Sequence, residues 1–171
     1  MAHGPAFIHS SGQHIFLELM GGAIMKKLLL TSAVILLGLN NVALAGETPS
    51  ASGAQQYFVN LADGDTVTAP FKVVFGLSGM GVAPAGVEMA NTGHHHILID
   101  RAPLGMGEDG AEELEDGIIS DENHLHFGKG QTETVLELKP GKHSLQLVLG
   151  DVNHVPHNPA VFSKVITITV K

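Results

Sequence analysis

The stretch Phe71-Lys72-Val73-Val74-Phe75-Gly76-Leu77 has a large apolar residue at every second position. Successive side chains of an extended strand point to opposite faces of a sheet, so this spacing predicts a strand with one buried face. The same two-residue spacing recurs in four more segments, at residues 95–99, 132–138, 145–149 and 166–170. The pattern is typical of half-buried strands and not of helices.

Turns that contain glycine or proline separate these segments, as at Asp63-Gly64-Asp65 and Lys139-Pro140-Gly141. Short strands broken by such turns, without helical periodicity, predict an all-β fold. We expect an immunoglobulin-like antiparallel β-sandwich of about seven strands. It would form a His-rich β-sandwich domain at residues 56–171, after a small, polar and flexible leader at residues 46–55.

The segment Leu138–Leu145 resembles the corner between two strands of immunoglobulin-like domains, where a tyrosine often hydrogen-bonds to the backbone a few residues upstream. In this chain His143 stands in place of the tyrosine. We therefore expect His143 to be a structural corner residue and not a metal ligand.

Residues 25–45 have the features of a secretory signal peptide. Two lysines follow Met25, an apolar run of 12 residues covers positions 28–39, and Ala43-Leu44-Ala45 ends the segment. Because a membrane-spanning helix needs about 20 apolar residues, we expect cleavage after Ala45 and not a membrane anchor. The predicted location is the periplasm or the outside of the cell.

Residues 1–24 precede the positively charged start of that signal. The residues Gly21-Gly22-Ala23-Ile24, directly before Met25, can be encoded by a ribosome-binding site. We therefore expect Met25 to be the true start and residues 1–24 to be a misassigned N-terminal extension. His3, His9 and His14 are left out of the candidate site for this reason.

The chain is acidic, with a formal net charge of −8 at pH 7, and it has no cysteine. An acidic chain is a poor partner for nucleic acid or anionic lipid, so we expect neither nucleic-acid binding nor stable membrane insertion after signal cleavage. The sequence does not indicate a protein partner. The acidic stretch Glu108–Glu122 is expected to be a solvated loop, because it lacks the alternating ligand order of a calcium-binding loop.

Seven histidines after residue 45 fall in three short clusters: His94-His95-His96, His124-Leu125-His126 and His154-Val155-Pro156-His157. In a strand, residues i and i+2 share a face and lie about 6.5–7 Å apart, so a His-x-His pair can aim two imidazoles at one ion. The candidate metal ligands are His94, His96, His124, His126, His154 and His157. We expect them to meet when the two sheets stack, with His124 and His126 as the best pair and His95, on the opposite face, as a structural residue.

Imidazole ligands without thiolate suit zinc, copper(II) or nickel, and the expected cofactor is copper or zinc, if any. Thioethers of Met80, Met89 and Met106 could add copper(I) binding. The alternative is a hydrogen-bonded imidazole network without metal, since a neutral imidazole can donate at one nitrogen and accept at the other.

Three ordered motifs together resemble domain-of-unknown-function family 4399, which consists of small exported bacterial proteins. They are Asn91–His96, His124–Glu133 and Gly150–His157, within a resemblance that runs from about Tyr57 to Val170. The stretch Glu108–Asp116 is longer than the usual connection in that family. The family has no established activity, so the resemblance implies export and fold and no reaction.

The residues favour a periplasmic metal-binding module for copper or zinc, without catalytic residues. A structural or interaction domain of the cell envelope, which could also sense pH through its imidazoles, is the non-metal alternative. The enzyme alternative is a copper-dependent superoxide dismutase-like activity. His124–Gly128 is similar to the His-x-His-x-Phe-Gly strand of copper–zinc superoxide dismutases, but its Phe127 comes one place earlier and the disulfide cysteines of that family are missing.

Overall fold

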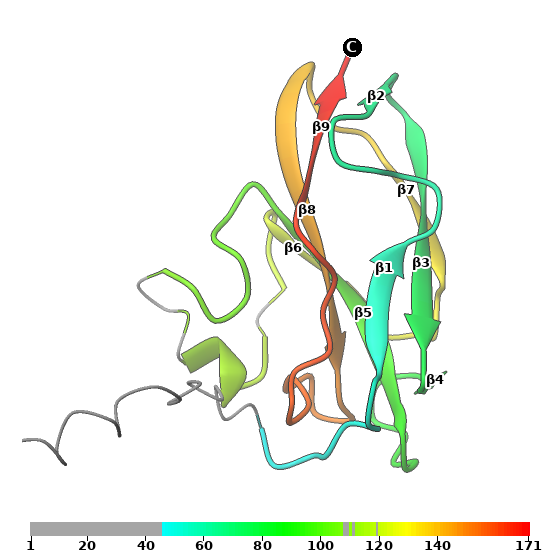
Figure 1. Ribbon diagram of the computed structural model, residues 1–171, viewed down its shortest axis with the longest axis vertical. Helices are drawn as coiled ribbons and strands as arrows, with labels where there is room; N and C mark the ends of the chain where they lie inside the picture. The colour runs from blue at the N-terminus through cyan, green and yellow to red at the C-terminus, as the bar shows by residue number, and fades with distance from the viewer. Residues whose placement is uncertain (1–45, 108–109, 111, 119) are drawn as a thin grey trace, which may run out of the picture. The chain divides into compact units, whose positions relative to one another are not determined.

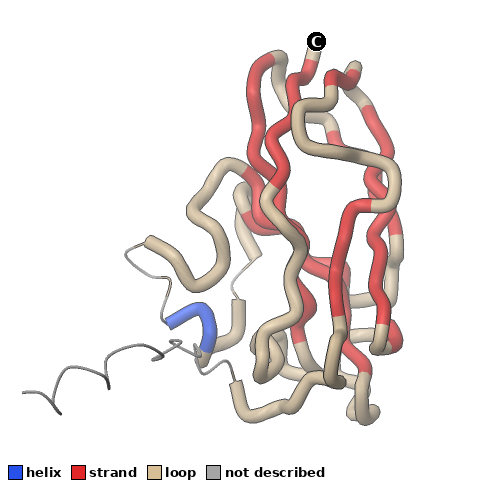
Figure 2. Tube along the Cα trace, viewed as in Figure 1, coloured by secondary structure: helices blue, strands red, loops and turns tan. Residues whose placement is uncertain are grey.

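The computed structural model describes residues 46–107, 110, 112–118 and 120–171, so the predicted signal peptide and N-terminal extension lie outside the described residues. Within these ranges, no helix has the length and apolar character needed to cross a bilayer. The described chain forms nine strands and one 3-10 turn, η1 (Glu112–Leu114), and the strands lie in two sheets (Figures 1 and 2). The predicted all-β class is confirmed.

The smaller sheet has the strand order β1-β3-β7 and is antiparallel: β1 (Gln55–Phe58), β3 (Phe71–Ser78) and β7 (Glu133–Leu136). The larger sheet has the order β2-β9-β8-β5-β4, with β6 also paired to β5: β2 (Thr66–Val67), β9 (Ile166–Val170), β8 (Gly141–Gly150), β5 (Thr92–Ile99), β4 (Gly81–Val82) and β6 (His124–Phe127). The two-residue strands β2 and β4 pair in parallel with their neighbours. They are too short to show alternation, which is why the sequence predicted about seven strands.

The main hydrophobic core lies between the facing sides of the two sheets. Val73 and Phe75 of β3 pack there with inward residues of the larger sheet, among them Ile97 of β5 and Leu147 of β8. All of these side chains are buried. The inward residues are those of the predicted alternation, so burial of apolar surface fixes which face of each strand points inward.

A second, smaller core covers part of the outward face of the larger sheet. Leu98 of β5 and Val148 of β8 point outward and pack against three apolar residues of the excursion between β5 and β6, namely Leu104, Leu114 and Ile118. In Figure 1 this excursion, coloured green to yellow, stands beside the sheet. Apolar anchors thus hold an acidic segment that the sequence predicts only to be a solvated loop.

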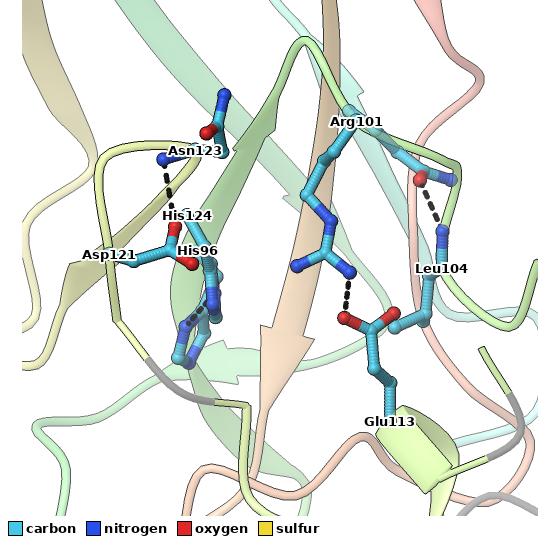
Figure 3. Close-up of polar contacts among 8 residues, drawn as sticks. His96, Arg101, Leu104, Glu113, Asp121, Asn123 and His124 are labelled. Atoms are coloured by element: carbon cyan, nitrogen blue, oxygen red, sulfur yellow. Dashed lines mark hydrogen bonds and ion pairs between the residues drawn. The ribbon is translucent and has the colours of Figure 1, made fainter. Parts of the chain in front are cut away.

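Polar contacts add to these anchors (Figure 3). Arg101 pairs with Glu113 of η1, and the backbone N–H of Leu104 donates to Oε1 of the buried Gln146 at 2.9 Å. The side chain of Asn123 donates to the carbonyl of Ile99 at 2.9 Å, near the point where the excursion rejoins the sheet. The excursion is therefore fixed at both ends, and it forms one wall of the region described below.

His143 occupies the predicted corner position. Its Nε2 lies 2.8 Å from the carbonyl of Lys139, four residues upstream, and its Nδ1 lies 2.6 Å from Oδ2 of Asp100. Both partners are acceptors, so both ring nitrogens are satisfied when each carries a proton. The hydrogen bond with Asp100 is the main cause that raises the pKa of His143. The structural role predicted for His143 is confirmed.

The segment predicted to be a flexible leader contacts the loop that follows β8. The N–H of Gly46 donates to the carbonyl of Pro156 at 3.1 Å, and Asn158 exchanges backbone hydrogen bonds with Thr48 and Ser50. These contacts differ from the expectation for residues 46–55. Composition does not reveal them, because the groups that pair are backbone groups.

Candidate metal centre

The register between β5 and β6 brings the two His-x-His pairs together. The strands are antiparallel, His96 lies opposite His126, and His124 lies opposite Leu98. Since Ile97 and its alternate neighbours point into the main core, His94 and His96 point outward. The imidazoles therefore gather on the outward face of the larger sheet. The sequence had led us to expect that they would meet where the two sheets stack, and this expectation is wrong.

His96 is at the centre of this cluster. Its Nε2 lies 3.0 Å from Nε2 of His94, and its Nδ1 lies 2.9 Å from Nε2 of His124, a contact that Figure 3 shows. One nitrogen each from His94, His96 and His126 lie within 4.8 Å of one another. Bonds of about 2.0–2.1 Å to a tetrahedral ion would place such nitrogens about 3.3 Å apart, so the three rings need only a small closure around it.

A fourth ring, that of His154, lies over the group of three. Its centroid is 4.5 Å from that of His126, 4.9 Å from His94 and 6.1 Å from His96. His154 has a φ of 71°, in the left-handed region. His154 lies in the loop that follows β8, and the sequence predicted a loop position for the third histidine cluster.

The carboxylate of Asp151 organises that loop. Its Oδ1 accepts the N–H groups of Asn153 and Val155 at 2.8 and 2.9 Å, and its Oδ2 accepts the hydroxyl of Thr48 at 2.6 Å. Asp151 is 4% exposed. A buried carboxylate with three donors holds the loop that places His154 above the other rings.

Two glycines, Gly128 and Gly150, make room for the imidazoles, and in the sequence they stand out only as parts of longer motifs. A Cβ on Gly150 would lie 2.6 Å from Nε2 of His96, and a Cβ on Gly128 would overlap the ring of His126. Glycine inside or next to a strand often marks such a close approach. The presence of glycine within or next to a predicted strand was the available signal in the sequence. It could not indicate which imidazole ring lies over which glycine.

Burial keeps the imidazoles of His94, His96 and His126 neutral. It lowers the pKa of His94 to about 4, with repulsion from His126 and His154 as further causes. Burial also lowers the pKa values of His96 and His126, and neighbouring histidines contribute to both shifts. Near pH 7 these rings are unprotonated, which is the form that binds a metal ion without first losing a proton.

Nε2 of His126 is buried and has no hydrogen-bond partner among the described residues. A buried nitrogen left in this state costs about 1–3 kcal/mol, so native proteins rarely keep one without a reason. An ion that Nε2 of His126 binds together with His94 and His96 would satisfy this nitrogen. The residues present therefore fit a transition metal.

The remaining histidines lie outside the group of three. His124 is buried behind His96 and contacts it through Nε2, as an outer partner of a ligand would. His157 is fully buried between backbone carbonyls, with Nε2 3.1 Å from the oxygen of Thr92. His95 faces the main core, as the sequence predicted, where its Nδ1 lies 2.8 Å from Nε2 of Gln56.

The structure thus brings five of the six predicted ligands into contact, His94, His96, His124, His126 and His154, and nitrogens of three of them, His94, His96 and His126, lie close enough to hold one ion. Two of the methionines suggested for copper(I), Met89 and Met106, are far more exposed than the clustered histidines. Met89 is 61% and Met106 62% exposed, whereas His94 and His96 are almost fully buried.

No curated protein matches the chain in sequence. The profile of the family described as "Domain of unknown function (DUF4399)" matches residues 73–171, more than half of the chain. The matched region contains both β-strands of the centre and the loop that carries His154. The chain therefore belongs to the DUF4399 family.

Proposed function

We propose that this protein is an exported metal-binding module whose centre holds one copper or zinc ion. The observation that supports this most strongly is the set of three nitrogens of His94, His96 and His126 within 4.8 Å, presented by two adjacent strands. Rigid strands hold ligands more precisely than loops do. Three imidazoles without a thiolate suit zinc(II) and copper(II) better than softer or harder ions.

Export follows from the signal peptide predicted at residues 25–45 and is part of the same proposal. The scaffold that we propose is an immunoglobulin-like β-sandwich. The core shared by the two sheets and the corner hydrogen bond of His143 support it. In this arrangement the inward face of the larger sheet stabilises the fold, and its outward face binds the ion.

Metal analysis of the purified protein tests the proposal. The protein is stripped with a chelator, reloaded separately with zinc(II), copper(II) or nickel(II), and assayed for bound metal and for affinity by competition. We expect one ion per chain and a loss of about 100-fold or more in affinity for His126→Ala. The matched control is His143→Gln, which removes a histidine of the same sheet outside the centre and should bind like the wild type. Absence of stoichiometric metal, or an unchanged affinity in His126→Ala, would contradict the proposal.

A structural role without metal is the second candidate. The contacts of His96 with His94 and His124 favour it, because they link rings without an ion. The double variant His124→Ala and His126→Ala separates the two candidates. If it unfolds the metal-free protein, the rings act as a structural network; if it removes metal affinity and leaves the metal-free fold intact, they act as a metal centre.

A further inference from the structure

A cavity of about 310 Å³ adjoins the three-histidine group. It is lined by Gly117, Ile118, Ser120, His126, Asn153 and His154. Two of these residues belong to the imidazole cluster, and the others come from the excursion after β5 and the loop after β8. The N–H of Ile118 donates to the carbonyl of His154 at 3.1 Å, so the two walls are tied together.

We propose that the metal keeps an open coordination position that faces this cavity and takes one small exogenous ligand, either water or hydroxide or a monovalent anion. In this inference, which rests on the proposed function, His94, His96 and His126 are the protein ligands. His154 does not bind the metal and instead hydrogen-bonds the exogenous ligand. His154 is thus a positioning residue of the ligand site.

His154 lies outside the group of three nitrogens. The nitrogens that come within 4.8 Å of one another belong to His94, His96 and His126, and His154 does not complete this group among the described residues. Its ring centroid is 6.1 Å from that of His96, compared with 4.7 Å for His94 and 5.1 Å for His126. A closed site of four imidazoles would need His154 to move toward His96.

Hydrogen bonds within the loop after β8 hold His154 in its position. The N–H of His154 donates to the carbonyl of Asp151 at 3.1 Å, and the N–H of Asp151 donates to the carbonyl of Val155 at 2.8 Å. The buried Asp151 carboxylate holds Thr48, Asn153 and Val155 in addition. Moving the backbone of His154 inward would break hydrogen bonds of this loop, so the fold favours a ring that stays at the edge of the cavity.

The chemistry of the cavity wall suits an anion or a water molecule. None of its described lining residues carries a carboxylate, and Asn153 offers a side-chain amide, whereas the hydroxyl of Ser120 donates to the carbonyl of His124 at 3.1 Å. Three neutral imidazoles leave the full positive charge on a divalent ion, which attracts an anion or a water oxygen. A water molecule occupies about 30 Å³ in the liquid, so the cavity has room for a small polyatomic anion.

Three protein ligands with one open position are typical of catalytic metal sites, whereas structural sites are closed by four. The inferred arrangement is therefore that of a metal centre that binds an exogenous ligand, and not that of a storage or structural centre. It is also consistent with the cavity beside His126, whose Nε2 is buried and has no hydrogen-bond partner within the described part of the chain.

Azide titration of the copper(II)-loaded protein tests the inference. We expect a saturable azide-to-copper charge-transfer band that corresponds to one azide per copper. The variant His154→Ala should still bind one copper, with metal affinity close to that of the wild type. Its azide affinity should fall about three- to tenfold, which is what one lost hydrogen bond contributes. His143→Gln, outside the cavity, should leave the azide affinity unchanged.

Each outcome has one meaning. No stoichiometric copper in the wild type contradicts the proposed function itself. Copper that binds stoichiometrically but gives no azide band overturns only the open position. If His154→Ala weakens copper binding as much as His126→Ala does, His154 is a fourth protein ligand and the site is closed. An unchanged azide affinity in His154→Ala overturns the role of that residue.

Discussion

Nε2 of His96 lies so close to the backbone of Gly150 that a Cβ on that glycine would be 2.6 Å from the nitrogen. Gly150 pairs with His94 across β5 and β8, so it faces the same outward side as both imidazoles. Gly150 belongs to the regular strand β8, so its backbone does not need the conformational freedom of glycine. The glycine is needed because the ring of His96 comes so close to the backbone. The sheet thus lies directly under the imidazoles, and a side chain at Gly150 would overlap the ring of His96.

The variant Gly150→Ala should therefore weaken both metal binding and the fold. The added methyl must displace the ring of His96, and it also meets Cα of His154 at 3.3 Å. We expect metal affinity to fall about 10- to 100-fold and stability by about 1–3 kcal/mol. Competition with a chromogenic chelator and thermal unfolding measure the two effects.

The control for this variant is Gly64→Ala. Gly64 has a φ of 87°, and a Cβ there meets nothing within 4 Å, so alanine should cost about 1 kcal/mol through backbone strain alone. Its metal affinity should stay at the wild-type level. Wild-type affinity in Gly150→Ala would show that His96 does not bind the ion in the position that the structure gives it.

The contact between His124 and His96 gives a second prediction. If His96 binds the metal through Nε2, its Nδ1 keeps the hydrogen bond with Nε2 of His124 at 2.9 Å. Removing such an outer partner typically costs about 10- to 100-fold in affinity without removing the ion. We expect His124→Leu to show this loss and His124→Gln, which can still hydrogen-bond, to show less. Complete loss of metal stoichiometry in both variants would instead make His124 a direct ligand.

The sequence predicted the faces of the longer strands because burial imposes the alternation directly. Val73 and Phe75 in β3 show this, and so does His95, which faces inward between two outward histidines. The alternation could not give the register between β5 and β6. A shift of two residues would keep every apolar side chain inward, yet it would place His124 in the position of His126. For this reason the two histidine pairs could be predicted from the sequence, but nothing in the sequence favoured His126 over His124 as a direct ligand.

Long-range packing decides the parts of the site that the sequence missed. Gly150 and Gly128 matter because a ring from another segment lies over each of them. His157 resembles a ligand in the sequence, and only the fold shows that backbone carbonyls of β5 and β8 surround it. Asp151 could be expected near the cluster, but the hydrogen bond that its carboxylate accepts from Thr48 comes from a segment 103 residues upstream, which the sequence does not reveal.

The lowered pKa values predict that the metal-free protein loses stability in mild acid. The pKa values of His94 and His95 are about 4 in the folded state and about 6.5 when the chain unfolds. Between these values the unfolded chain binds protons that the folded chain does not bind. The free energy of unfolding should therefore decrease as the pH falls from about 6.5 to about 4, by about 1.4 kcal/mol per pH unit for each fully buried histidine.

Urea unfolding of the metal-free protein at several pH values measures this slope. The variant His95→Leu removes one of the buried histidines outside the metal centre, so its slope should be shallower than that of the wild type, although its stability at pH 7 is also expected to change. Equal slopes in the two proteins would mean that His95 is not held neutral by burial. Bound metal should protect the protein from acid until the ligands become protonated.

The pair of His143 and Asp100 predicts the opposite pH dependence at a different place in the fold. The pKa of His143 is raised above 6.5, mainly by its hydrogen bond with Asp100. The stabilisation from this pair is therefore fully present below pH 6.5 and is lost as the pH rises through the raised pKa. In Asp100→Asn the pKa of His143 should fall toward its ordinary value, because an amide does not favour the charged ring as a carboxylate does. Asparagine suits the left-handed φ of 52° at this position and can still accept the N–H of Ser144, so the corner itself should remain folded. An NMR titration of the His143 ring in the wild type and in Asp100→Asn measures the shift, and identical pKa values in the two proteins would show that Asp100 does not hold the proton on His143.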